Sequence, residues 1–148
     1  MPIPAFNQNG LLPVGIHQVT LDDIRQRFGR FQQNDRRPRL FEKLLELITA
    51  MKHSGLFERL LIDGSFVTAK EKPNDIDVIA VLRHGHNFER ELSMIEYALI
   101  SRSLLQRRFG FDVIVAQTES AVYYKYVEFF SRVREAPDLR KGLLELKL

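Results

Sequence analysis

Residues 60–82 read LLIDGSFVTAKEKPNDIDVIAVL, and this segment sets the expected fold class. It joins two short apolar runs, over residues 56–62 and 75–82, that are rich in branched side chains and bounded by turn formers, as β-strands are. The polar residues between the runs predict a connection on the surface. We therefore expect a sheet that contains both strands.

The rest of the chain alternates helical and strand patterns. Prolines and glycines exclude a continuous helix from residues 1–19, which we expect to form an extended N-terminal arm. A third strand is expected at residues 111–116, and a small strand or turn at residues 142–146. Apolar residues at helical spacing predict helices over residues 21–28, 38–53, 88–108 and 120–133. The pattern indicates one α+β domain that spans residues 1–148.

Composition narrows the functional classes. The chain has 148 residues, of which 45% are hydrophobic and 28% are charged, and no apolar run approaches the roughly 20 residues needed to cross a bilayer. The absence of cysteine excludes disulfides, thiolate metal sites and cysteine nucleophiles. The N-terminus lacks the features of a signal peptide, so we expect a cytoplasmic protein with no membrane association.

Three aspartates suggest a metal site. Because strand side chains alternate between faces, Asp75 and Asp77 are expected on one face with Cα atoms about 6.5–7 Å apart. Their mutual repulsion favours a cation between them. Asp112 begins a later strand and would join them if that strand lies beside theirs. Three carboxylates of this kind suit a hard cation such as Mg²⁺. Asp63, by alternation on the opposite face from its neighbours, is expected to have a structural or supporting role.

Gly64 and Ser65 follow the strand that precedes this pair. A glycine lets the backbone approach a phosphate closely, and the serine hydroxyl and amide can both donate hydrogen bonds to it. A lone Asp-x-Asp is a weak signal. The order of strand, Gly-Ser, polar connection, Asp-x-Asp strand, helix and a further strand with a leading aspartate is much more specific.

This order resembles the DNA polymerase β-like nucleotidyltransferase superfamily. The similarity covers residues 56–116 and rests on the strand before Gly64-Ser65, on Asp75-Ile76-Asp77 and on Asp112. It is greatest to the small bacterial members, some of which belong to toxin–antitoxin or phage-defence pairs. The resemblance implies a small mixed or antiparallel sheet flanked by helices, with residues 56–116 as the catalytic core.

The resemblance also implies an activity. A nucleoside monophosphate would pass from a nucleoside triphosphate, most simply ATP, to a hydroxyl on RNA, a protein or a small molecule. Asp75, Asp77 and Asp112 would be the catalytic residues and the ligands of two Mg²⁺ ions, and Asp112 would also take the proton of the acceptor. Gly64 and Ser65 would hold the β- and γ-phosphates. A core that fills so much of the chain would need a partner protein or a homodimer to bind the acceptor.

The connection between the motifs departs from the small members, which carry Ala-Arg-Gly after Gly-Ser and a serine before the first aspartate. Here residues 67–70 read VTAK, Asn74 precedes the acids, and the connection is one residue shorter. Lys70 and Lys72 are the candidates for binding the triphosphate in place of the missing arginine. A catalytically weakened protein, such as an antitoxin or regulatory partner with the same fold, is the alternative that this departure favours.

Six arginines lie between Arg25 and Arg39 with a single acid, Asp35. This segment is either a solvated linker between helices or a surface for RNA, a nucleotide or an acidic partner. A third hypothesis is therefore an RNA-binding module without catalysis. It predicts RNA affinity that falls steeply with salt and does not change in Asp75→Ala.

Overall fold

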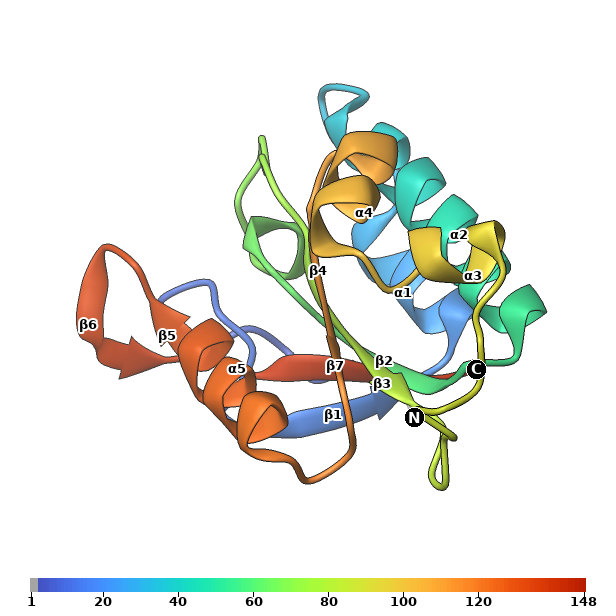
Figure 1. Cartoon of the computed structure of the whole chain (residues 1–148). Helices are drawn as coiled ribbons and strands as arrows, with labels where there is room; N and C mark the ends of the chain where they lie inside the picture. Colours follow the sequence, from blue (N-terminus) through green and yellow to red (C-terminus); the bar gives the residue numbers. More distant parts are fainter. Residues whose placement is uncertain (1–2) are drawn as a thin grey trace.

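The computed structural model describes residues 3–148 and has a five-stranded mixed sheet with helices on both faces, which confirms the α+β class (Figure 1). The strand order is β1-β7-β2-β3-β4. Strands β2 (Phe57–Asp63), β3 (Asp77–Leu82) and β4 (Asp112–Ala116) correspond to the three expected strands. β2 is antiparallel to β3, and β3 is parallel to β4.

The two ends of the chain complete the sheet. β1 (Ile16–Val19) runs parallel to β7 (Leu143–Lys147), and β7 is antiparallel to β2. The last part of the expected arm is therefore extended but paired in the sheet, and residues 1–2 lie outside the described residues. The expected small strand at residues 142–146 is an interior strand, so the sheet extends beyond residues 56–116.

Helices α1 (Leu21–Phe28), α2 (Arg36–Ser54) and α4 (Arg102–Phe109) cover one face, and α5 (Ala121–Ser131) covers the other (Figure 1). Alternating strand residues supply both cores, because neighbouring side chains point to opposite faces. The first core is the larger and includes Leu44, Leu60, Ile62, Val78 and Val113. The second includes Leu61, Ile79, Ile114, Tyr123 and Phe130.

Local signals explain where the predicted helices begin and end. Thr20 and Asp23 form a reciprocal capping box at the start of α1, and Gly29 ends that helix. α2 ends at Gly55, whose φ of 71° is the left-handed conformation that glycine adopts without strain. These two helices lie within two residues of their expected bounds.

The helix expected over residues 88–108 is wrong. The structure has two short helices there, α3 (Met94–Ala98) and α4, and no helix between residues 83 and 93. Ser93 and Ser101 each accept a hydrogen bond from a backbone N–H three residues later, and so start separate helices. The spacing of Phe88 and Leu92 imitates a helix, but the Phe88 side chain is exposed.

The helix expected over residues 120–133 ends at Ser131 instead. The next residues form a hairpin of β5 (Arg132–Val133) and β6 (Ala136–Arg140), which no sequence pattern indicated. This hairpin leads through Lys141 and Gly142 into β7. Within residues 3–148, no helix is both long and apolar enough to cross a bilayer.

Candidate active site

Three aspartates lie side by side at one end of the sheet. Asp77, the first residue of β3, pairs in register with Asp63 at the end of β2 and with Asp112 at the start of β4. Residues in register on neighbouring strands point to the same face, here the face that α5 covers further along the strands. Asp112 was expected to join Asp77 if their strands are neighbours, and the pairing of β3 with β4 meets this condition. The sequence did not indicate that Asp63 would be in the same row.

The Gly64–Ser65 turn packs directly against the Asp75–Asp77 segment. Gly64 has a φ of 94°, and a Cβ atom on it would lie 2.8 Å from the Asp75 carbonyl oxygen and 3.0 Å from the Asp77 nitrogen. Only glycine fits both the conformation and the space. Beyond it, the short 3₁₀ helix η1 (Ser65–Val67) starts the connection to β3.

Ser65 holds Asp75 in place just before β3 begins. Its backbone N–H and its hydroxyl both donate to Asp75 Oδ1, at 2.9 and 2.6 Å. The same hydroxyl oxygen accepts the N–H groups of Asn74 and Asp75. Burial acts to raise the pKa of Asp75, but the hydrogen bonds from Ser65 outweigh it and the pKa lies below its usual value. The predicted phosphate donors are thus bonded to a carboxylate.

Asp77 lies in the middle of the acids. Burial, followed by the negative charges of Asp75 and Asp112, raises its pKa to about 6. A cation that enters the site would offset the repulsion between Asp77 and the neighbouring acids. Asp77 is therefore suited to be a cation ligand.

Asp112 is bound by an arginine. Arg102, the first residue of α4, donates from Nε and Nη2 to the two carboxylate oxygens of Asp112, at 2.8 and 2.7 Å. Arg102 also lies over the ring of Tyr126 on α5, with its guanidinium carbon 5.8 Å from the ring centroid. This two-point contact holds the Asp112 carboxylate in one orientation and offsets its negative charge.

Asp63 is the most buried acid of the row, with 1% of its surface exposed. Neither of its carboxylate oxygens accepts a well-formed hydrogen bond from the described residues. The ammonium of Lys141 lies 3.2 Å from Oδ2, and the Lys141 side chain is itself only 14% exposed. Burial raises the pKa of Asp63 to about 7 against the opposing charge of Lys141.

The connection from η1 to β3 is fixed by an arginine of the basic segment. Arg37 is 2% exposed and donates to the carbonyl oxygens of Phe66, Thr68 and Lys70, at 2.6 to 2.7 Å. The solvated-linker and ligand-surface hypotheses are therefore both wrong for Arg37, which is part of the interior. Lys70 and Lys72 are exposed, and neither forms an ion pair within residues 3–148.

The donor set fits magnesium in its chemistry, because Asp75, Asp77 and Asp112 offer only carboxylate oxygens and the neighbouring Asp63 has unsatisfied oxygens. Within residues 3–148, however, no three acidic or histidine side chains are grouped closely enough to hold one ion. Asp75 is bonded to Ser65, and Asp112 to Arg102. A cation at this site would exchange places with these donors.

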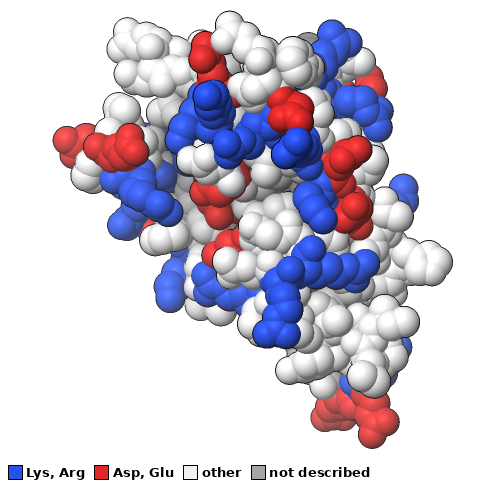
Figure 2. Space-filling model, turned by 90° about the horizontal axis from the view of Figure 1, so that it is seen from above, with Lys and Arg blue, Asp and Glu red and all other residues white. Residues whose placement is uncertain are grey.

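The charge around the site is of mixed sign. Viewed onto the end of the sheet where β4 begins, acidic side chains are bordered on several sides by lysines and arginines (Figure 2). Two surface hollows lie elsewhere: one beside β1 and β7, the other between Leu82, Phe88 and Val122. Neither hollow is lined by Asp63, Asp75, Asp77 or Asp112.

Comparison with protein families gives one match. The model of DUF6932, described as a family of unknown function, matches residues 4–147. The chain belongs to this family. Comparisons with curated proteins and with solved structures gave no match.

The sequence indicated the acids and the turn of this DUF6932 protein but not the cations that hold them. Lys141 pairs with an acid far along the chain and Arg37 binds backbone carbonyls, so no local pattern indicates either contact. Arg102 pairs with Asp112 only ten residues away, but the sequence analysis did not predict this contact. The sequence sign near Lys141 is the glycine that follows it, which is typical of a crowded backbone position. In the structure, a Cβ atom on Gly142 would lie 2.1 Å from the Pro13 carbonyl oxygen.

Proposed function

We propose that this protein is a magnesium-dependent nucleotidyltransferase that moves a nucleoside monophosphate from a nucleoside triphosphate, most simply ATP, to a hydroxyl group. The observation that carries the proposal is the register of Asp77 with Asp112, next to a glycine–serine turn that packs on Asp75. Carboxylates on adjacent strands beside such a turn suit phosphoryl chemistry. The proposed location is the cytoplasm, and the acceptor is RNA, a protein or a small molecule.

The reaction needs charge neutralisation and alignment. The acceptor oxygen attacks the α-phosphorus, the bond from that phosphorus to the bridging oxygen breaks, and pyrophosphate leaves with the electron pair. Bound Mg²⁺ would supply positive charge at the phosphates and lower the pKa of the acceptor hydroxyl. Asp75 and Asp77 would hold the cations, and Asp112 would help to hold them and accept the hydroxyl proton. Ser65 would keep Asp75 ionised and in position.

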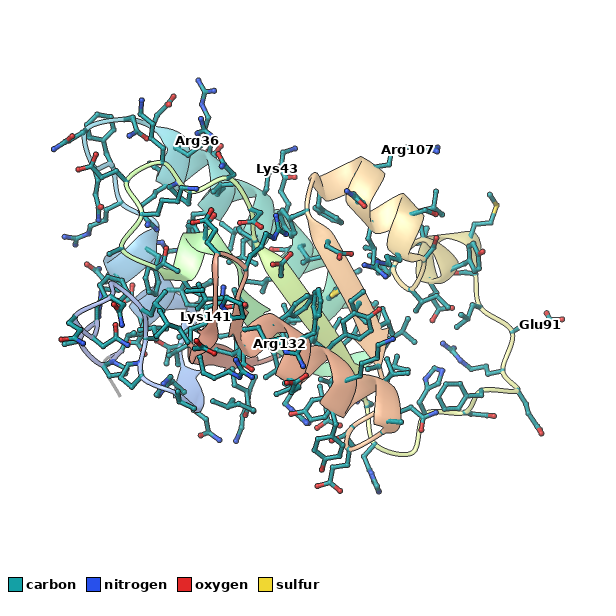
Figure 3. The ribbon with its side chains drawn as sticks, turned by 90° about the vertical axis from the view of Figure 1, so that its left-hand side faces the viewer. Arg36, Lys43, Glu91, Arg107, Arg132 and Lys141 are labelled. Atoms are coloured by element: carbon teal, nitrogen blue, oxygen red, sulfur yellow. The ribbon has the colours of Figure 1, made fainter. Side chains whose placement is uncertain are left out.

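Thermal unfolding tests the nucleotide site without knowledge of the acceptor. A ligand at 100 times its Kd adds about 2.7 kcal/mol to the free energy of unfolding, which for a chain of this size raises Tm by roughly 5–10 °C. We expect such a rise with at least one of the four nucleoside triphosphates and Mg²⁺, and none with EDTA. Asp77→Asn and Asp75→Ala should remove the shift, whereas Glu91→Gln, an exposed acid on the loop before α3, should keep it (Figure 3).

Transfer itself is measured with α-labelled triphosphate and total cellular RNA and protein as acceptors. Label should appear in one acceptor fraction with release of pyrophosphate, and Asp77→Asn should abolish it. No shift with any triphosphate at millimolar concentration would overturn the proposal.

A second candidate is a nucleotide-binding protein of the same fold without turnover, as in an antitoxin or regulatory partner. The two-point contact of Arg102 with Asp112 favours this candidate. Both carboxylate oxygens of Asp112, the proposed proton acceptor, already accept hydrogen bonds from Arg102. This candidate predicts the magnesium-dependent shift without transfer of label. If Arg102 is the cause, Arg102→Ala should then gain transfer. Arg37 is buried and cannot contact RNA, but Arg25, Arg30, Arg36 and Arg39 are exposed, so the RNA-binding hypothesis stays a prediction.

A further inference from the structure

The segment that follows the β5–β6 hairpin places a lysine beside the acid row, which consists of Asp63, Asp77 and Asp112 in register. Lys141 directly follows β6, and its backbone N–H donates to the carbonyl of Ser131, the last residue of α5, at 2.8 Å. Its side chain turns toward the sheet, where Nζ lies 3.2 Å from Asp63 Oδ2. Lys141 is labelled in Figure 3, which looks onto the hairpin.

The backbone after Lys141 packs closely against the N-terminal segment. Gly142 donates to the carbonyl of Leu12, and a Cβ atom on Gly142 would overlap the Pro13 carbonyl and approach His17 Nε2 to 2.7 Å. His17 is in turn bonded to Pro13 through that nitrogen. The N-terminal segment thus fixes the position from which the lysine side chain extends.

The hairpin carries three further cations, Arg132, Arg134 and Arg140. Arg134 is exposed in the turn of the hairpin and forms no ion pair within the described residues. By contrast, Arg132 and Arg140 of the same hairpin are both paired with Glu128.

We propose that Lys141 binds the β- and γ-phosphates of the nucleoside triphosphate. This inference rests on the proposed function and assigns the anion contacts of that site to the hairpin rather than to Lys70 and Lys72. A site of four neighbouring carboxylates repels a polyanion unless fixed cations lie within reach. Ser65, the predicted phosphate donor, already donates both of its groups to Asp75, whereas the ammonium of Lys141 has three N–H donors and its ion pair with Asp63 needs only one of them.

Titration calorimetry with Mg²⁺ separates a phosphate contact from a structural role. ATP and inorganic pyrophosphate carry the groups that Lys141 would bind, and AMP lacks them. Lys141→Ala should weaken ATP and pyrophosphate binding by about 10- to 100-fold and leave AMP binding within about twofold. Lys141→Arg should retain most of the affinity.

Two further variants control for folding and position. Asp63→Asn/Lys141→Ala removes both members of the buried pair, so it leaves no unpaired charge and should still lose ATP affinity selectively. Arg132→Ala, on the same hairpin but paired with Glu128, should bind ATP within about twofold of the wild type. Lys70→Ala/Lys72→Ala should likewise change ATP affinity little.

The outcomes distinguish this inference from the proposed function. If the wild type binds ATP and Asp77→Asn does not, while the Lys141 variants bind ATP normally, the hairpin assignment is wrong and the nucleotidyltransferase proposal stands. Equal losses for ATP and AMP would likewise overturn the assignment, because they indicate a structural role. If the wild type binds no triphosphate, both fail.

Discussion

Asp75 and Asp63 lie on opposite sides of the Gly64–Ser65 turn and are held in opposite ways. Asp75 is half-buried and accepts two hydrogen bonds from Ser65, a neutral residue close by in the chain, which keep its pKa low. Asp63 is fully buried and lacks well-formed hydrogen bonds. Its counter-ion Lys141 comes from the far end of the chain, and its pKa rises to about 7.

The contrast separates a local contact from a tertiary one. The Asp75 turn forms whenever residues 64–75 fold back on themselves, and its hydrogen bonds satisfy the charge without a cation. The Asp63–Lys141 contact exists only when the hairpin and β7 have docked on the sheet. Docking of the C-terminal segment and ionisation of the site are therefore linked.

Removing Lys141 is expected to have the largest effect on stability. Lys141→Ala leaves Asp63 buried without a counter-ion, which costs about 3–5 kcal/mol of the free energy of unfolding. Chemical denaturation at pH 8, where Asp63 is mainly ionised, measures this. Asp63→Asn/Lys141→Ala should be more stable than the single variant, because no unpaired charge remains. If Lys141→Ala costs the same in the wild type and in Asp63→Asn, the pair is not coupled.

The pH dependence of stability is the next largest effect. The folded-state pKa of Asp63, about 7, is above the value of about 3.9 in an unfolded chain, so the folded protein binds the extra proton between pH 4 and 7. The free energy of unfolding should fall as pH rises through this window, by about 2–4 kcal/mol in total.

The Asp63→Asn variant cannot titrate at this position, so most of that fall should be absent from it. A smaller fall should remain below pH 6, because the raised pKa of Asp77 acts in the same direction. Asp75, whose pKa is lowered, changes the free energy of unfolding only below pH 4, where its contribution to stability is lost as the pH falls. Denaturation curves at half-unit pH steps, without Mg²⁺, measure the difference between the two proteins.

The local side of the comparison is tested at Gly64. Gly64→Ala forces alanine to a φ of 94° and places its Cβ against the backbone of Asp75 and Asp77, so we expect a loss of about 2–3 kcal/mol. Gly85→Ala is the matched control, because Gly85 has a φ of 79° but open space around it, and it should lose about 1 kcal/mol. Similar losses in the two variants would mean that the close approach contributes nothing.

The same contrast explains what the sequence could predict. The strands around Gly64-Ser65 and Asp75-Ile76-Asp77 follow from period-two patterning and turn residues, which are local properties. The neighbouring position of Asp112 was only conditional in the sequence, and the parallel pairing of β3 with β4 supplies it. These features made the acids and the turn predictable together.

The position of Lys141 and the edge of the sheet were not predictable, because they depend on long-range pairing. Nothing near β7 indicates that it lies between β1 and β2, and the position of Lys141 depends on that placement. Arg37 stands in a run of arginines without a local sign of burial, and only the carbonyls of residues 66–70 distinguish it. The helix error at residues 88–108 has the opposite cause, because there a local pattern was present without a buried face.

Ser65→Ala is expected to have the smallest effect and sharpens the local side of the comparison. It removes the hydroxyl donor to Asp75 but keeps the backbone N–H, which still donates to the same oxygen at 2.9 Å. We expect a loss of about 1–2 kcal/mol, since a hydrogen bond to a half-buried carboxylate is replaced in part by water. The pKa of Asp75, followed by carboxyl NMR, should rise toward its usual value without reaching it. An unchanged pKa would mean that the backbone N–H alone holds the charge, and the serine would then be available to a phosphate.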